Sequence, residues 1–333
     1  SVNFMSPIAG RMAWTGNSAG FITTTVNLPA AANGQNVVLR FRRGADMLPL
    51  LRGMFALVIW DTQARRGFAA RDPYGIKPLY YAQTAEGVWF GSQVKALLAT
   101  GRIDSAPCAE GQAGFWQLGS VPEPHTWYAA IKALPAGHCV HFSEGALASA
   151  PQAWWRIADD FQATGLPVVP EAELRTRVRA AVLDSVGAHL VADVPVAVFL
   201  SGGIDSGALA AMMVELGARE LHGITVAFRE FAGSNDDEAP VAASVADRYG
   251  IRHHIRWVSR DEFQADLPKI LDAMDQPTID GVNTWFASKA VAELGLKVVV
   301  SGVGGDELFQ GYASFEELPR LVARWRWLAR IPG

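Results

Sequence analysis

The chain has 333 residues, of which 50% are hydrophobic and 19% are charged. This length exceeds one typical domain and fits two, and the composition excludes a chain that is disordered throughout. The 29 Lys and Arg residues nearly balance the 33 Asp and Glu residues, so a net charge of −4 gives no reason to expect nucleic acid as a partner. Two cysteines cannot form a disulfide framework, and no Cys/His spacing indicates a zinc site.

The hydrophobic residues do not form a segment that could cross a membrane. The longest apolar runs, such as Val194–Leu200, have the length of a buried strand. The chain does not open with a basic segment followed by an apolar one, so nothing indicates export. We therefore expect a cytoplasmic enzyme with neither a membrane nor a nucleic acid as its partner.

The first half, to about residue 155, is expected to be rich in strands. Short apolar runs are separated by turns that contain Gly, Pro and charged residues, a pattern typical of a layered, sheet-rich domain. The sequence predicts strands at 54–60, 68–71, 79–81 and 88–90, helices at 92–99 and 111–118, and a hairpin around 137–142.

The second half alternates strands with amphipathic helices, which predicts a parallel sheet covered on both faces. A stretch containing Pro and Gly separates the halves, so we expect domains at 1–155 and 156–333. The predicted order is helix 171–189, strand 194–200, helix 206–216, strand 221–228, helix 238–249, strand 254–258, helices 260–272 and 284–293, and strand 297–300.

A glycine-rich turn that carries an aspartate, Ser201-Gly-Gly-Ile-Asp-Ser206, follows a predicted strand and opens a predicted helix. Ligands of open parallel sheets bind beyond the carboxyl ends of the strands, and a helix N-terminus offers backbone N–H groups to anions. Gly202 and Gly203 let the backbone approach a phosphate closely, while Ser201 and Ser206 supply hydroxyl donors. The turn lacks the lysine of the common triphosphate-binding loop, and Asp205 would repel a phosphate unless Mg²⁺ bridges the two.

A second turn of the same kind, Ser301-Gly-Val-Gly-Gly-Asp306, follows the last predicted strand. One Gly-Gly turn after a strand is most often only structural. Two such turns, each with an aspartate and each at the end of a parallel strand, favour a binding site. The sequence therefore predicts that Asp205 and Asp306 hold Mg²⁺ beside a pyrophosphate group.

These motifs resemble the pyrophosphate loop of the ATP pyrophosphatase superfamily, and most closely the glutamine-hydrolysing asparagine synthetase family. The segment Ser301–Tyr312 is similar to that family's second motif. The first half agrees independently, because four of its segments resemble the later part of the family's glutaminase domain in the same order. These segments are Leu51–Leu57, Arg71–Tyr81, Phe90–Leu98 and Leu134–His138.

The resemblance implies a fold for each half. Residues 1–155 would form a partial, degenerate class II glutamine amidotransferase domain, an αββα sandwich of the N-terminal-nucleophile type. Residues 156–333 would form a doubly wound parallel-sheet ATP pyrophosphatase domain, which is adenine nucleotide α hydrolase-like.

The resemblance also implies a carbon–nitrogen ligase that uses ATP and Mg²⁺ to adenylate the side-chain carboxylate of aspartate, or of a similar acceptor. Ammonia, which the family obtains from glutamine, then gives the amide, AMP and pyrophosphate; a homodimer is compatible with this. By match, Asp205 and Asp306 would be catalytic and bind the metal. Ser201, Gly202, Gly203, Asp205 and Ser206 would hold pyrophosphate, and Leu200, Val226, Ser301 and Gly302 would border the adenine and ribose.

The glutaminase pattern is incomplete in this sequence. The family's nucleophile is an N-terminal cysteine whose own α-amine is the base, whereas this chain starts Ser1-Val-Asn. Asn33-Gly-Gln35 is only a weak counterpart of the family's glutamine-binding turn. We therefore assign no glutaminase nucleophile and find no support for glutamine hydrolysis by this chain.

The synthetase pattern departs from the family at two places. Val303 stands where typical members carry a glutamate linked to adenylation, and Glu307 or Asp280 is the candidate replacement, although Glu307 also fits a first-turn helix acid. The sequence ends at Gly333, so we expect a C-terminally truncated synthetase domain. Two alternatives stay open, namely a different adenylating amide synthetase of the β-lactam-forming kind and an inactive nucleotide-binding remnant.

Overall fold

The computed structural model describes residues 4–6, 12–16, 22–26, 44–61, 63–161 and 169–326. The chain divides into two compact units. The N-terminal unit contains residues 1–173 together with 264–285, and the C-terminal unit contains residues 174–263 together with 286–333. The segment 264–285 therefore packs with residues that lie more than a hundred positions earlier in the chain.

The described strands of the N-terminal unit form three antiparallel sheets. The first has the order β1-β2-β3, the second β10-β9-β5-β4 with β11 paired to β9, and the third β7-β6-β8. Their bounds are β1 Phe4–Ser6, β2 Met12–Gly16, β3 Ile22–Val26, β4 Ala56–Asp61, β5 Arg66–Arg71, β6 Tyr80–Thr84, β7 Gly87–Gly91, β8 Ile131–Ala133, β9 His138–Ser143, β10 Ala146–Leu147 and β11 Gln152–Ala153.

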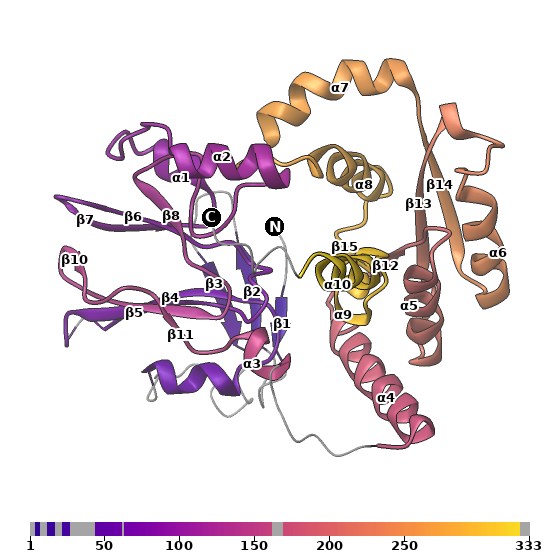
Figure 1. Cartoon of the computed structure of the whole chain (residues 1–333), viewed down its shortest axis with the longest axis horizontal. Helices are drawn as coiled ribbons and strands as arrows, with labels where there is room; N and C mark the ends of the chain where they lie inside the picture. The colour runs from indigo at the N-terminus through magenta and orange to yellow at the C-terminus, as the bar shows by residue number, and fades with distance from the viewer. Residues whose placement is uncertain are drawn as a thin grey trace, which may run out of the picture. The chain divides into compact units, whose positions relative to one another are not determined.

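The second and third sheets pack face to face and are covered by helices on their outer faces (Figure 1). Phe142 of β9 packs against Phe90 of β7 between the sheets, with ring centroids 4.9 Å apart. The 3₁₀ helix η2 (Gly44–Leu50) covers one outer face through Leu48, and α1 (Val94–Leu98) covers the other through Val94. Two further helices are α2 (Ala109–Leu118) and α3 (Ile157–Phe161). The layers therefore run helix, sheet, sheet, helix.

The loop after β5 is held by two buried charged residues. Arg71 donates to the carbonyl oxygens of Gly75, Lys77 and Leu134 at 2.6–2.7 Å, and to the Glu123 carboxylate. Asp72, which is 1% exposed, accepts backbone N–H groups from four residues at 3.0–3.3 Å. A buried carboxylate is tolerated here because both its oxygens are saturated with donors. Those donors belong to Phe55, Tyr74, Ile76 and Lys77.

We expect Asp72→Asn to destabilise the N-terminal unit by about 2–4 kcal/mol, because the amide nitrogen would face two backbone donors. Urea unfolding, followed through hydrogen exchange of peptides from 55–78, measures the change. Asp61→Asn is the matched control, since Asp61 also accepts two backbone N–H groups but in an exposed turn. Equal unfolding midpoints for the two variants would contradict the role given to Asp72.

The C-terminal unit is built on a parallel sheet with strand order β14-β13-β12-β15. The predicted mixed α/β fold with a parallel sheet is confirmed, and the predicted elements are present with ends shifted by up to three residues. The elements after residue 170 are α4 Glu171–His189, β12 Val196–Phe199, α5 Ile204–Glu215, β13 His222–Phe228, η3 Arg229–Phe231, α6 Ala239–Tyr249, β14 Arg252–Val258, α7 Arg260–Ala273, α8 Gly281–Glu293, β15 Val298–Val300, α9 Gly305–Phe309 and α10 Ser314–Trp325. Most of α7 and the start of α8 fall within 264–285 and so belong to the N-terminal unit.

Helices cover both faces of this sheet. Val198 of β12 lies in a core with Met213 of α5 and Ala242 of α6. On the opposite face, Ala197 packs with Ala290 of α8. Neighbouring residues of a strand point to opposite faces, so β12 must be apolar at consecutive positions to serve both layers.

Two histidines form a stacked pair on neighbouring strands. The His222 ring of β13 lies parallel to the His254 ring of β14, with 3.0 Å between Nδ1 and Nε2. Burial and the neighbouring charges of His222 and Arg252 lower the pKa of His254 from its ordinary value of 6.5. Protonating His254 therefore costs more in the folded protein than in the unfolded chain.

The stability contributed by this pair should be complete above about pH 6.5 and should be lost as the pH falls through the lowered pKa of His254. We expect the melting temperature of the C-terminal unit to fall between pH 7 and pH 5, and to fall less in His254→Gln. His189→Gln, on an exposed part of α4, should keep the wild-type slope. A His254→Gln slope equal to that of the wild type would refute the assignment.

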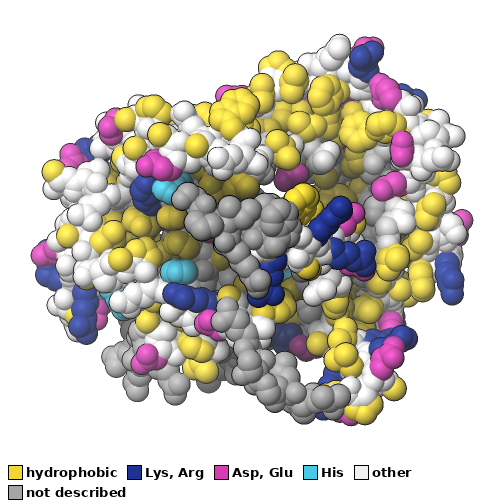
Figure 2. Space-filling model, in the orientation of Figure 1, with side chains coloured by type: hydrophobic (Ala, Val, Ile, Leu, Met, Phe, Trp, Pro, Cys, Tyr) yellow, Lys and Arg dark blue, Asp and Glu magenta, His cyan; other side chains and the backbone are white. Residues whose placement is uncertain are grey.

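Hydrophobic side chains are common on the surface of the described residues. Figure 2 shows them scattered over the face in view, with Lys and Arg interspersed among Asp and Glu. Trp116 of α2 is 80% exposed, and Ile204 and Val303 are 89% and 90% exposed. Among the described helices, none combines the length and apolar character needed to cross a membrane.

Candidate active site

The strand order of the parallel sheet reverses between β12 and β15. From β12 the chain passes outward to β13 and β14, and then returns to place β15 on the other side of β12. Such a switch point separates the loops at the carboxyl ends of two neighbouring strands, and open α/β sheets bind their ligands there. Both aspartate-bearing turns predicted from the sequence follow these two strands, so the structure brings them to one edge.

The first turn is organised by its two serines. The buried Ser206 Oγ accepts the Ser201 backbone N–H at 3.1 Å and lies 2.9 Å from Ser201 Oγ, which in turn accepts the Gly203 N–H at 3.2 Å. Gly202 and Gly203 are exposed at the start of the twelve-residue helix α5. The serines therefore shape the loop, and the glycines leave its backbone accessible to an anion.

The second turn approaches the first so closely that it requires glycine. A Cβ atom added at Gly302 would lie 3.4 Å from the Ser206 nitrogen, and one added at Gly305 would lie 2.4 Å from Asp205 Oδ2. Gly304 between them has φ +97°, in the left-handed region. The Asp205 carboxylate thus occupies space that a side chain at position 305 would fill.

The second aspartate lies in an acidic cluster with a tyrosine. Asp306 turns back toward Gly311, where an added Cβ atom would lie 1.9 Å from Asp306 Oδ1. The Tyr312 hydroxyl donates to Glu307 Oε1 at 3.0 Å. That hydrogen bond raises the pKa of Tyr312, and the charges of Asp306 and Asp205 raise it further. The charges of both aspartates therefore act on the Tyr312 hydroxyl.

This donor set fits a hard divalent cation. Carboxylate oxygens are the ligands that Mg²⁺ prefers, and the charges of both Asp205 and Asp306 reach the Tyr312 hydroxyl. The glycines at 302 and 305 let the Asp205 side chain lie directly against the second turn. Asp205 and Asp306 are the residues that would hold the cation.

The residues predicted to border the nucleotide lie on two faces of the sheet. Leu200, which is 2% exposed, packs on the side of α5 and α6, whereas Val226 of β13 packs on the side of α8. Ser301 is exposed, and its Oγ accepts the Val303 N–H at 3.3 Å. Leu200 and Val226 therefore pack on opposite faces of the sheet.

Sequence reasoning missed Thr225. Its buried hydroxyl donates to the Leu200 carbonyl at 2.7 Å and lies 2.7 Å from His253 Nε2. It therefore fixes the end of β12 immediately before the first turn. The β-strand pattern predicts a buried residue at this position, but it does not show that a hydroxyl reaches across to the neighbouring strand.

A groove lies beside the first turn, and one of its lining residues is Arg248, a positively charged side chain that the sequence did not indicate. The groove is lined by Gly202, Gly203 and Ile204 from the first turn, and by Val245, Arg248 and Tyr249 from α6. Arg248 lies 46 residues after Gly202 in the chain, so only the packing of α6 against α5 reveals that they share a groove.

The remaining predicted residues are divided between the units. Glu307 lies in the first turn of α9, which agrees with its interpretation as a first-turn helix acid. Val303 projects into solvent. Asp280 belongs to the N-terminal unit, where it precedes α8 and its carbonyl accepts the Thr284 N–H. Ser1 and residues 33–35 lie outside the described residues.

Family models match both halves of the chain. The asparagine synthase model matches residues 177–332, and the glutamine amidotransferase domain model matches residues 35–155. A Mycobacterium tuberculosis protein provisionally named as a glutamine-hydrolyzing asparagine synthetase is 37% identical over 279 residues, which are 82% of this chain and 42% of that protein. Asparagine synthetase [glutamine-hydrolyzing] 1 of Bacillus subtilis is 35% identical over 80% of this chain and 41% of its own length.

The chain belongs to the asparagine synthetase family. It spans less than half the length of these curated relatives. Similarity to solved structures is weak: the glutamine-dependent NAD⁺ synthetase of Acinetobacter baumannii, in complex with ADP, has 16% identity and a TM-score of 0.30, over 93% of this chain and 61% of that one.

Gly305→Ala tests the close approach of the two turns. The atom in its way is the end of a flexible side chain, so we expect the Asp205 carboxylate to swing aside while the unfolding midpoint hardly changes. Mn²⁺, used as a paramagnetic substitute for Mg²⁺, should bind at least about tenfold more weakly, which water-proton relaxation measures. Gly187→Ala, in a roomy position on α4, should bind Mn²⁺ as the wild type does. Unchanged Mn²⁺ binding in Gly305→Ala would argue against a metal beside Asp205.

Proposed function

We propose that this chain carries the ATP-dependent, amide-forming site of an asparagine synthase. The site would adenylate the side-chain carboxylate of aspartate, and ammonia would then convert the adenylate to asparagine. The observation that carries the proposal is the contact of Asp205 with the glycines of the second turn, at the switch point of a parallel sheet. The family models and the relatives support the same reaction.

The chemistry divides into two displacements. A carboxylate oxygen of aspartate attacks the α-phosphorus of ATP, and pyrophosphate leaves with the electron pair of the broken bond. Ammonia then attacks the acyl carbon, AMP leaves, and a proton is lost from nitrogen. AMP is a far better leaving group than the oxide it replaces, so the first step makes the second feasible.

The residues of the two turns would act on the departing pyrophosphate. The backbone of Gly202 and Gly203 and the N-terminal end of α5 offer N–H groups and partial positive charge to it. Ser201 and Ser206 hold that loop in shape. Asp205 and Asp306 would bind Mg²⁺, which neutralises the phosphate charge when bound. Leu200, Val226, Ser301 and Gly302 would border the adenosine.

The finer fold assignment is part of the proposal. The C-terminal unit would be an ATP pyrophosphatase domain, because its phosphate loop follows the first strand of a doubly wound parallel sheet. The helix, sheet, sheet, helix layering of the N-terminal unit favours a partial amidotransferase domain of the αββα type. We place the domains at 1–155 and 156–333, a division that keeps the two family-model matches apart.

We propose that ammonia is the nucleophile that attacks the adenylate, and that neither Cys108 nor Cys139 releases it from glutamine. Both cysteines are buried, so neither is placed to attack a glutamine side chain. Val303 leaves the acceptor less constrained than a glutamate would, because valine can neither exchange a proton nor orient an amine. Aspartate is the proposed acceptor on the strength of the family.

Exchange of labelled pyrophosphate into ATP tests the adenylation step. We expect exchange that depends on aspartate and Mg²⁺, and a loss of about 100-fold or more in Asp205→Asn and in Asp306→Asn. Asp193→Asn is the control, because Asp193 is exposed and precedes β12 at the opposite edge of the sheet. Wild-type exchange in Asp205→Asn would defeat the metal assignment.

The acceptor and the nitrogen donor are tested in the same preparation. A panel of carboxylates in the exchange assay should give aspartate the highest rate, and amide formation should follow ammonium rather than glutamine. Exchange with another carboxylate alone would favour a different adenylating amide synthetase. ATP binding without exchange for any carboxylate would favour a nucleotide-binding remnant and would overturn the proposed reaction.

A further inference from the structure

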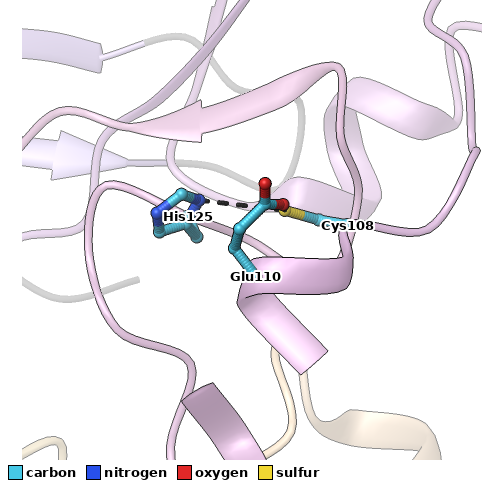
Figure 3. Close-up of side chains that lie close together, drawn as sticks. All are labelled: Cys108, Glu110 and His125. Carbon is cyan, nitrogen blue, oxygen red and sulfur yellow. Dashed lines mark hydrogen bonds between the residues drawn. The ribbon is translucent and has the colours of Figure 1, made fainter. Parts of the chain in front are cut away.

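Three side chains with different metal-binding atoms converge in the N-terminal unit. Cys108 Sγ lies 3.8 Å from His125 Nδ1 and 3.4 Å from Glu110 Oε2 (Figure 3). The sulfur, nitrogen and oxygen atoms all lie within 4.8 Å of one another. Among the described residues, no other group of three or more Cys, His, Asp and Glu side chains meets this condition.

The convergence is fixed by the backbone on both sides. Cys108 is the N-cap of α2, where its sulfur accepts the Gly111 N–H at 3.4 Å, and Glu110 lies in the first turn of the same helix. The loop that carries His125 is tied to the segment before α2. The Cys108 N–H donates to the Trp127 carbonyl at 2.9 Å, and Pro107 forms a β-bridge with Tyr128. The three side chains are therefore brought together by ordered backbone on two sides.

The distances fit the edges of a tetrahedron around a small ion. With Zn–S near about 2.3 Å and Zn–N near about 2.1 Å, tetrahedral angles place S and N about 3.6 Å apart. The two observed separations from Cys108 Sγ, 3.8 Å and 3.4 Å, lie on either side of that value. Thiolate, imidazole and carboxylate are the three ligand types that zinc sites use.

The exposure of the three residues suits a metal better than a nucleophile. Cys108 is 2% exposed, so its sulfur is not open to a substrate. Glu110 is exposed and His125 is half-buried, so an ion can enter from their side and keep a fourth position for water. The N-terminal end of the ten-residue helix α2 favours anionic ligands. Hydrogen bonds from its own backbone and from the Cys108 thiol lower the pKa of Glu110.

We propose that Cys108, Glu110 and His125 bind one Zn²⁺ ion, with a fourth position open to solvent. The same helix and loop hold the segment that follows α7. Ser120 forms a β-bridge with Thr278, and the Trp127 N–H donates to Gln276 Oε1 at 2.7 Å. An ion that joins His125 to the start of α2 would therefore also restrain the attachment of residues 276–279.

Cobalt substitution provides the most direct test. We expect the metal-free full chain to bind one Co²⁺ per molecule with a sulfur-to-cobalt charge-transfer band and the visible bands of tetrahedral cobalt, and Zn²⁺ to displace it. Cys108→Ser should lose the charge-transfer band. Serine is itself a good N-cap, so this variant keeps the helix start while it removes the sulfur ligand. Cys139→Ser, at the other buried cysteine, should keep the band.

Glu110→Gln provides a second test. Because Glu110 is exposed, this substitution does not disturb the buried core as a change at Cys108 could. The variant's affinity for Zn²⁺ should fall at least about tenfold, while Glu86→Gln, at an exposed ion pair with Arg102, should bind as the wild type does. Zn²⁺ should slow hydrogen exchange in 119–128 and 276–279 of the wild type and not of Cys108→Ser. Asp205→Asn should bind Zn²⁺ normally, which keeps this site distinct from the proposed magnesium site. A Cys108→Ser protein that retains the band, or a wild type that binds no Co²⁺, would overturn the proposal.

Discussion

The close approach of two glycine turns is the constraint on which the candidate active site depends. Asp205 lies where a side chain at position 305 would have to be, and Gly302 lies against the first amide groups of α5. Neither contact is required by the sheet, since parallel strands can end in loops of many shapes. Several glycines here cost conformational entropy on folding. They allow the two turns to approach closely at the carboxyl edge of the sheet, and they leave the N-terminus of α5 accessible to an anion.

The sequence predicted the parallel-sheet unit well because its signals are local. Apolar runs of strand length alternate with helical periodicity, and glycines mark the strand ends, so β12, α5 and β15 lie within a few residues of their predicted bounds. The edge shared by Asp205 and Asp306 followed from the rule on parallel sheets. What the pattern could not supply was cross-strand contact. The Thr225 hydroxyl reaches the Leu200 carbonyl only because β13 pairs with β12 in one register.

The polar contacts of the N-terminal unit show the same limit more strongly. Nothing in the local sequence distinguishes Asp72, which is buried beneath four backbone donors, from the exposed Asp61. The Cys108 cluster was invisible for a related reason. Its histidine comes from a loop fifteen residues after Glu110, and zinc motifs are recognised by regular short spacings. Metal ligands that are irregularly spaced in the sequence can be recognised only when the folded backbone shows that they lie close together.

The grouping of residues 264–285 also could not be predicted, and it has a physical consequence. Helical periodicity predicted α7 and α8 but carried no information about which core they would join. In the structure the intervening turn is bound to α2 and its loop: the Ile279 N–H donates to the Gly119 carbonyl, and the Asp275 carboxylate accepts the Val94 and Lys95 N–H groups. Asp275 therefore caps α1 from 180 residues away. Because α1 lacks a capping side chain of its own, the N-terminal unit depends on a segment that is synthesised after most of the parallel sheet.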